Sequence, residues 1–177
     1  LLAAALVSSA VAAPALYPKL GDVRKIPPDL IGLNGNVLSL DRPWHDERFL
    51  AAFRASGAGL FRFPAGTIAN TYDWDLGWLD PTVKTEDLID WVRQIDRGPD
   101  NRRRYGLDDL AAFHRGTGAT TVFVLNMLSK DLEHSLRGLR RARDLGLPVK
   151  YIELGNELFF NLPLESRIFP TPEDYGR

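Results

Sequence analysis

Four short runs rich in β-branched and aromatic residues alternate with segments of helical periodicity along most of this chain. The β-rich runs are Leu30–Asn34, Leu60–Phe63, Thr121–Asn126 and Val149–Leu154. Helical spacing of apolar residues covers 46–56, 86–95, 107–115 and 132–145, and Pro172–Tyr175 opens a further helix. Alternation of strands and helices is typical of a parallel sheet, so this pattern restricts the chain to the α/β class.

Each β-rich run has one apolar face and one face that ends in a polar group. Because side chains alternate across a strand, Phe61 lies opposite Arg62, and the other runs carry Asn34, Asn126 and Glu157 on the polar side at their carboxyl ends. An apolar face suits a covering layer of helices, and catalytic groups of (β/α)₈ barrels lie at the carboxyl ends of the strands. The pattern favours a (β/α)₈ TIM barrel, of which about the first four strand–helix units are present. The alternative is a small, self-contained doubly wound α/β domain.

Composition and motifs narrow the possible functions. The 177 residues carry 22 Lys and Arg against 23 Asp and Glu, for a net charge of −1, and no Cys. A nearly neutral chain predicts no nucleic-acid partner, and the absence of Cys excludes thiolate metal sites and cysteine nucleophiles. The sequence has no dinucleotide fingerprint, P-loop or Gly-x-Ser-x-Gly motif, so no cofactor is expected. No metal is expected either, because the two carboxylates of Asp73-Trp74-Asp75 are too few for a cation site.

The first 15 residues begin with an uncharged, Ala-rich run that resembles the apolar part of a secretory signal peptide. The run is too short to span a membrane, which takes about 20 residues. We interpret residues 1–15 as a signal peptide remnant and predict a secreted protein, extracellular or periplasmic. The alternative is a frayed, Ala-rich terminus.

Two motifs carry a resemblance to a known group of enzymes. The run Ile152–Glu157 resembles the acid/base motif of the clan A glycoside hydrolases, retaining (β/α)₈ enzymes whose fourth strand ends in Asn-Glu. Phe61–Asn70, continuing to Tyr72 and Trp74, resembles the strand-two segment of the arabinofuranosidase and heparanase-like branches, although Ala65 departs from their usual Arg-x-Pro-Gly-Gly pattern. The resemblance implies that residues 16–177 are the N-terminal half of the catalytic barrel.

The resemblance implies hydrolysis of O-glycosidic bonds in an oligosaccharide, polysaccharide or other glycoside. A retaining glycosidase needs a carboxylic acid that protonates the leaving oxygen and a carboxylate nucleophile about 5–5.5 Å away. Glu157 is the candidate acid/base, and Asn156 would hydrogen-bond the sugar 2-hydroxyl. The resemblance places the nucleophile on strand seven, beyond residue 177. A non-catalytic, secreted glycan-binding protein with a degenerate barrel is the alternative.

Arg62 and two amides are further candidates for the substrate site. An unpaired guanidinium inside a barrel would be costly, so Arg62 should meet a carboxylate. Either it orients the nucleophile, as the resemblance implies, or it pairs with Glu153 for structure. Asn34 and Asn126 are rim amides that would hold sugar hydroxyls or satisfy loop main-chain groups.

Aromatic residues gather in the long connection after the second β-rich run. Sugars expose apolar C–H faces that stack on aromatic rings, so Tyr72 and Trp74 are candidate substrate-binding residues. The alternative is a hydrophobic cluster beneath a long loop.

Overall fold

The computed structural model describes residues 27–36, 44–97, 104–160 and 162–176. At its centre lies a four-stranded parallel sheet in the order β1 (Gly32–Asn34), β2 (Leu60–Phe63), β5 (Thr120–Leu125) and β6 (Val149–Leu154). The sheet order follows the chain order, so each connection leads to the adjacent strand. The predicted α/β class with a parallel sheet is confirmed, and the described strands lack the reversal of order that defines a doubly wound sheet.

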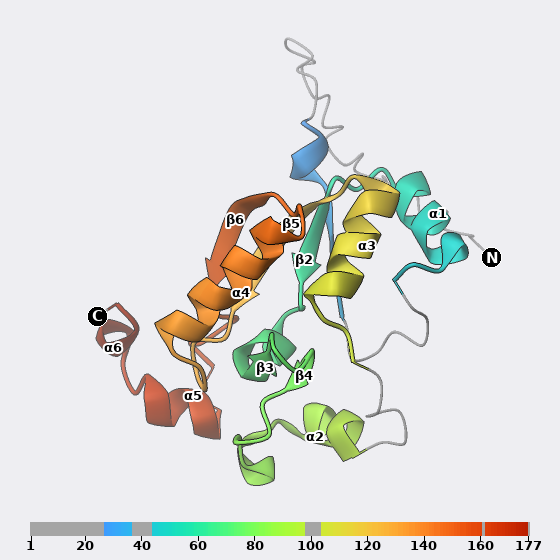
Figure 1. The fold of residues 1–177 in the computed structure, drawn as a ribbon. Helices are drawn as coiled ribbons and strands as arrows, with labels where there is room; N and C mark the ends of the chain where they lie inside the picture. Colours follow the sequence, from blue (N-terminus) through green and yellow to red (C-terminus); the bar gives the residue numbers. More distant parts are fainter. Residues whose placement is uncertain (1–26, 37–43, 98–103, 161, 177) are drawn as a thin grey trace, which may run out of the picture.

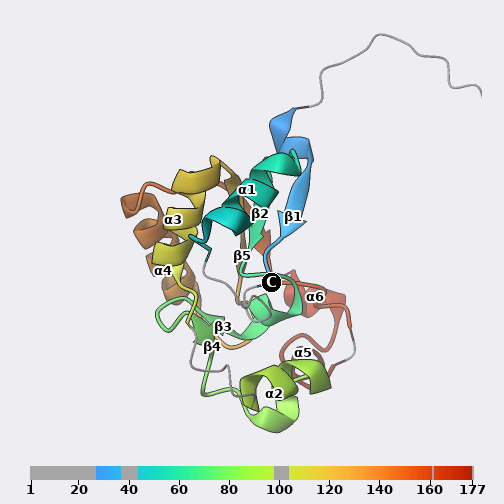
Figure 2. The ribbon, with the colours of Figure 1, turned by 90° about the vertical axis from the view of Figure 1, so that its right-hand side faces the viewer.

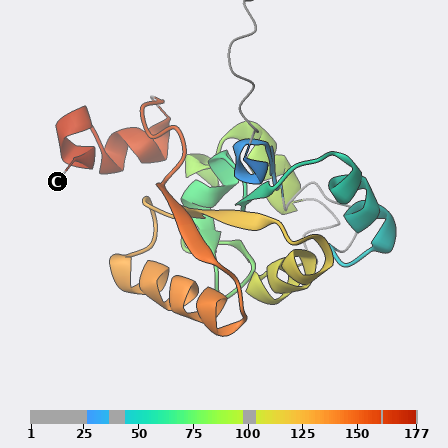
Figure 3. The same ribbon diagram turned by 90° about the horizontal axis from the view of Figure 1, so that it is seen from above.

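Three helices cover one face of this sheet (Figures 2 and 3). They are α1 (Glu47–Ala55), α3 (Leu107–Thr117) and α4 (Leu132–Asp144). The side chains of Asp46 and Asp131 cap α1 and α4 by accepting main-chain N–H groups of the first turn. These helices agree with the predicted segments to within two residues at each end.

The hydrophobic core lies between this helix layer and the sheet. Trp44 is fully buried and meets the rings of Phe61 and Phe63 edge-on, at centroid distances of 5.2 and 5.4 Å. Phe113 of α3 and Phe123 of β5 belong to the same core. The predicted apolar faces of β2 and β5 therefore pack against the helices, which directs Arg62 to the opposite side.

The two edge strands carry the same apolar face without cover. Leu33 on β1, Ile31 just before it, and Ile152 and Leu154 on β6 are between 45% and 53% exposed. The sequence pattern thus fixes which way these side chains point, but in the described part of the chain the helix layer covers only the centre of the sheet.

Two predicted elements differ from the structure. Leu30 belongs to the 3₁₀ helix η1 (Pro28–Leu30) and not to β1, because Pro28 is preorganised for the first helical position. The predicted helix 86–95 is divided into the 3₁₀ helix η4 (Thr85–Asp87) and α2 (Asp90–Arg97). Between them Leu88 is extended, with ψ at 139°, and buries its side chain.

The connections at the carboxyl ends of the strands hold several small elements. After β2 come the 3₁₀ helix η3 (Thr67–Thr71), the antiparallel pair β3 (Tyr72–Asp73) and β4 (Trp78–Leu79), and α2. After β6 come α5 (Pro163–Ile168) and α6 (Pro172–Tyr175). In Figure 1 the strand arrows point toward β3, β4 and α2. The sequence predicted neither the β3–β4 pair nor α5.

Among the described residues, none of the helices combines the length and the apolar character needed to cross a bilayer. The predicted signal peptide remnant, residues 1–15, lies outside the described residues.

Candidate active site

Arg62 is the centre of a polar cluster on the side of the sheet opposite the helices. Its Nε donates to Oε2 of Glu153 at 2.8 Å, and its Nη2 donates to Oε1 of the same carboxylate. Because β5 lies between β2 and β6, this pair links two strands that are not neighbours. Pairing with Glu153 is one of the two roles that the sequence left open for Arg62.

The same guanidinium also holds two of the predicted site amides. Nη2 donates to Oδ1 of Asn156 at 2.8 Å, and Nη1 donates to Oδ1 of Asn34 at 3.2 Å. Side chains from β1, β2 and the end of β6 thus meet at one point. A guanidinium offers five N–H donors in a rigid, planar fork, which lets a single residue hold these three acceptors in fixed positions.

Asn156 and Glu157 occupy a sharp turn directly after β6. Gly155 has φ at 74° and Glu157 has φ at 49°, a left-handed conformation that is uncommon outside glycine. Asn156 is buried, and its Nδ2 donates to Oε2 of Glu157 at 3.2 Å. Glu157 itself is exposed, so the carboxyl is open to a ligand while the neighbouring amide is fixed.

A cavity of about 340 Å³ lies beside this turn. Its walls include Asn34, Arg62, Gly66, Trp91, Asn156 and Glu157. Gly66 fits closely, since a Cβ there would lie 3.1 Å from Oδ1 of Asn156. The volume is within the usual range of small-ligand sites.

Trp91 is a site residue that the sequence analysis missed. It lies on α2, is 39% exposed and lines the same cavity as Glu157. Its indole therefore has the accessible surface that stacking on a sugar ring requires. In the sequence Trp91 reads as one more apolar residue of a helix, three positions after Leu88 and four before Ile95, so no sequence signal distinguishes it.

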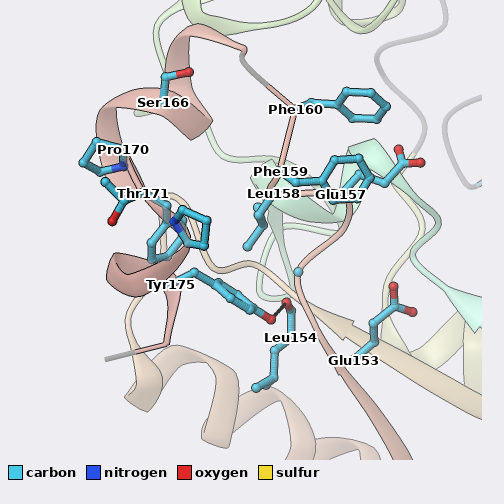
Figure 4. Close-up of a pocket in the computed structure, with 13 residues that line it drawn as sticks. Glu153, Leu154, Glu157, Leu158, Phe159, Phe160, Ser166, Pro170, Thr171 and Tyr175 are labelled. Atoms are coloured by element: carbon cyan, nitrogen blue, oxygen red, sulfur yellow. Dashed lines mark hydrogen bonds between the residues drawn. The ribbon is translucent and has the colours of Figure 1, made fainter.

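A second cavity, of about 420 Å³, lies between the end of β6 and the segment α5–α6. Figure 4 shows Pro170, Thr171 and Tyr175 on one side and Phe159 and Phe160 on the other. The Tyr175 hydroxyl donates to the main-chain oxygen of Leu154 at 2.7 Å. Glu157 lines both cavities, so this residue lies between them.

Tyr72 and Trp74 do not lie where the sequence analysis expected them. Both rings are in the core, only 1% and 5% exposed. The Trp74 ring stacks on Phe123 at a centroid distance of 5.9 Å, and the Tyr72 hydroxyl donates to the main-chain oxygen of Tyr105. The rings therefore do not offer stacking surfaces at a cleft. They form the hydrophobic cluster that was the alternative, because the β3–β4 pair folds them back onto the sheet.

Asn126 uses its side-chain amide within the chain. Its Oδ1 accepts the N–H groups of Leu128 and Ser129, and its Nδ2 donates to the Tyr72 main-chain oxygen and to the Ser129 hydroxyl. Satisfying loop main-chain groups is one of the two roles that the sequence allowed for this residue.

A buried ion cluster lies beneath the β3–β4 pair. The Lys130 ammonium is 2.7 Å from Asp73 Oδ2 and 3.1 Å from Asp80 Oδ2. Burial raises the pKa of Asp73, but hydrogen bonds from Lys130 and from the main chain outweigh it, so the pKa is below its ordinary value. The ammonium between these two carboxylates links the connection after β2 to the loop after β5.

Asp73, Asp75 and His134 are close enough to offer ligand atoms to one metal ion, within 4.8 Å of one another. His134 is far from the two carboxylates in the sequence, and α4 brings it to them. Lys130 already neutralises Asp73, and Nη2 of Arg137 lies 3.5 Å from Asp75 Oδ2. Positive charge is therefore supplied by the chain itself at both carboxylates.

Comparison with known proteins gives matches only to solved structures. No family model matches the sequence, and no curated protein matches it either. The chain is similar to an α-L-arabinofuranosidase from Thermotoga maritima in complex with arabinose, at 19% identity and a TM-score of 0.45, covering 75% of this chain and 32% of that enzyme.

Two further solved structures are similar. A GH51 α-L-arabinofuranosidase from Thermotoga petrophila RKU-1 matches at 19% identity and a TM-score of 0.46, over 76% of this chain and 32% of that one. A family 51 α-L-arabinofuranosidase from Bifidobacterium longum matches at 17% identity and a TM-score of 0.49, over 79% and 33%. The chain spans about a third of the length of each of these enzymes.

Proposed function

We propose that this chain forms part of a retaining glycoside hydrolase of the clan A type, with Glu157 as general acid/base. The observation that carries the proposal is the placement of Asn156 and Glu157 beside a cavity of about 340 Å³, at the carboxyl end of a parallel strand. Catalytic groups of (β/α)₈ enzymes occupy this position. The agreement of sheet order with chain order, and the uncovered apolar faces of β1 and β6, support a barrel with further strands.

The chemistry follows from two carboxyl groups. Glu157 donates its proton to the glycosidic oxygen while the bond from this oxygen to the anomeric carbon breaks, and a carboxylate nucleophile on a further strand bonds to that carbon. The Glu157 carboxylate then takes a proton from water as the water oxygen displaces the nucleophile. Asn156 donates to the sugar 2-hydroxyl, a contact that strengthens in the transition state.

Two other residues of the cavity position the site amides and contact the sugar. Arg62 fixes Asn156 and Asn34 through the hydrogen bonds described above. Trp91 offers its exposed indole to the C–H face of a sugar ring. This lining thus offers polar groups to the sugar hydroxyls and one aromatic ring to the C–H face of the sugar.

The protein is also proposed to be exported, since the uncharged run at residues 1–13 has the composition of a signal sequence. N-terminal sequencing of the secreted full-length protein should find a mature chain that starts near residues 13–16. Retention of residues 1–12 in the exported protein would contradict this proposal.

The acid/base role is tested by Glu157→Ala in the full-length protein. The substrates are 2,4-dinitrophenyl and methyl glycosides of a panel of pentoses, hexoses and uronic acids. Turnover of the methyl glycoside should fall by roughly 10²–10⁴-fold, the usual contribution of a positioned general acid. Formation of the glycosyl-enzyme from the dinitrophenyl glycoside should survive, because this leaving group departs without protonation.

Added azide should restore turnover of the dinitrophenyl glycoside by Glu157→Ala as a glycosyl azide, since azide needs no general base. Glu173→Ala, an exposed carboxylate of α6, is the matched control and should keep wild-type rates. Normal hydrolysis of the methyl glycoside by Glu157→Ala would refute the assignment. A wild-type protein that binds glycans but hydrolyses none would favour the glycan-binding alternative.

A further inference from the structure

Asn70 forms two hydrogen bonds with the main chain of Asn156, the residue that precedes Glu157. Its side chain belongs to η3, is 1% exposed and lies 86 positions away in the sequence. Oδ1 accepts the Asn156 N–H at 2.8 Å, and Nδ2 donates to the Asn156 main-chain oxygen at 2.8 Å. One amide thus satisfies both main-chain groups of Asn156.

The second of these contacts acts on Glu157 through covalent geometry. The Asn156 carbonyl and the Glu157 N–H belong to the same rigid peptide plane. A hydrogen bond to that oxygen therefore fixes the peptide plane on the N-terminal side of the N–Cα bond, whose rotation is the φ angle of Glu157. Glu157 has φ at 49°, a conformation that a non-glycine residue keeps only where its surroundings hold it. On the other side of the residue, the Glu157 main-chain oxygen accepts the Phe160 N–H at 3.0 Å.

Glu165 of α5 fixes the orientation of the Asn70 amide. This carboxylate is buried, and its Oε1 accepts the other N–H of Asn70 Nδ2 at 3.3 Å. If the amide were flipped, Asn70 Oδ1 would face two acceptors, the Glu165 carboxylate and the Asn156 carbonyl. The carboxylate therefore selects the amide orientation that hydrogen-bonds both main-chain groups of Asn156.

We propose that Asn70 is a positioning residue for the Glu157 carboxyl, with Glu165 holding Asn70 in its working orientation. The inference rests on the proposed function, because a positioned acid presupposes acid catalysis. A role confined to satisfying buried main-chain groups would also explain the contacts of Asn70, so the test must measure the action of the acid and not stability alone.

The test is Asn70→Asp in the full-length protein, assayed on the methyl and 2,4-dinitrophenyl glycosides of one sugar. The new side chain keeps an acceptor for the Asn156 N–H, but it has no N–H for the Asn156 oxygen or for the Glu165 carboxylate. Displacement of a catalytic group by about 1 Å costs on the order of 10²-fold. We therefore expect kcat for the methyl glycoside to fall by about 10–100-fold, while formation of the glycosyl-enzyme from the dinitrophenyl glycoside changes little.

Asn126→Asp is the matched control, since Asn126 is an equally buried amide that holds main-chain groups of another loop. Asn126→Asp should lower the unfolding midpoint as Asn70→Asp does. Its effect on the rate, however, should be the same factor for the methyl and the dinitrophenyl glycoside. Hydrogen exchange supplies a readout that needs no activity: the amide protons of Asn156 and Glu157 should exchange faster in Asn70→Asp than in the wild type.

Glu165→Gln gives a second, milder variant if Asn70→Asp does not fold. It should show the same dependence on leaving group with a smaller loss. Equal rate losses for the two leaving groups in these variants would overturn the positioning role and leave the glycosidase proposal standing. Absence of turnover in the wild-type protein would overturn both, whatever the exchange rates show.

Discussion

Removal of the Glu153 carboxylate should destabilise the protein more than removal of an ordinary surface acid. Glu153→Ala leaves Arg62, on the side of the sheet opposite the helices, without its bidentate partner. The two side chains are 25% and 40% exposed, between a surface pair and a buried one. Surface pairs contribute about 0.2–1 kcal/mol, and breaking a fully buried pair costs about 3–5 kcal/mol.

The remaining contacts of Arg62 reduce the expected loss. Asn34 and Asn156 still accept from its guanidinium in Glu153→Ala, so the charge keeps two of its three partners. We therefore expect the free energy of unfolding to fall by about 1–2 kcal/mol, a factor of about 5–30 in the unfolding equilibrium.

Urea unfolding of the full-length protein, followed by circular dichroism, measures this loss. The matched control is Glu133→Ala, which breaks the pair between Glu133 and Arg140 on the surface of α4, where the side chains are 59% and 57% exposed. Its loss should stay below about 1 kcal/mol. Glu153→Gln should lie between the two, because the amide keeps one acceptor. If Glu153→Ala costs no more than Glu133→Ala, the reasoning that Arg62 depends on Glu153 is refuted.

Three further predictions concern other parts of the molecule. Hydrogen bonds from Lys150 and Tyr151 lower the pKa of Asp29 from 3.8 to about 2. The stabilising contribution of Asp29 is therefore complete above pH 3.8 and is lost as the pH falls toward 2. The free energies of unfolding of the wild type and Asp29→Asn, measured as a function of pH, should converge below that range. Trp91→Ala should raise KM for a glycoside substrate while leaving the unfolding midpoint nearly unchanged, because this ring is partly exposed; an unchanged KM would remove Trp91 from the sugar site. Gly138→Ala should destabilise the protein despite the better helix propensity of alanine, since the new Cβ would lie 2.9 Å from the buried Trp74 ring; a gain in thermal stability would contradict this packing.

The strands, the main helices and their faces could be predicted from the sequence because they depend on local periodicity. Alternation in the β-rich runs placed Phe61 and Arg62 on opposite sides of β2, and the structure confirms that the ring is buried and that the guanidinium lies on the other side of the strand. The same reasoning placed Glu157 after the last strand of the sheet. These inferences need only the period of a strand and the direction of a parallel sheet.

The long connections could not be predicted in the same way, because their conformation is decided by distant partners. Tyr72 and Trp74 have the composition of a sugar-binding loop, yet the β3–β4 pair and the small side of α4 at Gly138 draw these rings into the core. Trp91 reads as a core residue of a helix, yet the break at Leu88 turns it toward the cavity of Glu157. In each case the sequence gives the chemistry of the side chain, and packing decides whether that side chain meets solvent.

The sequence by itself determined the α/β class and the polar ends of the strands, since both follow from residue type and local spacing. The candidate acid Glu157 was named from the resemblance of Ile152–Glu157 to a known acid/base motif. Only the tertiary structure decided that Arg62 reaches across β5 to Glu153, and that Asn70 and Glu165 hold the turn at Asn156. These contacts join residues 86 to 95 positions apart. No local pattern encodes them, because hydrogen-bond geometry between such residues exists only after the sheet and its connections have brought them together.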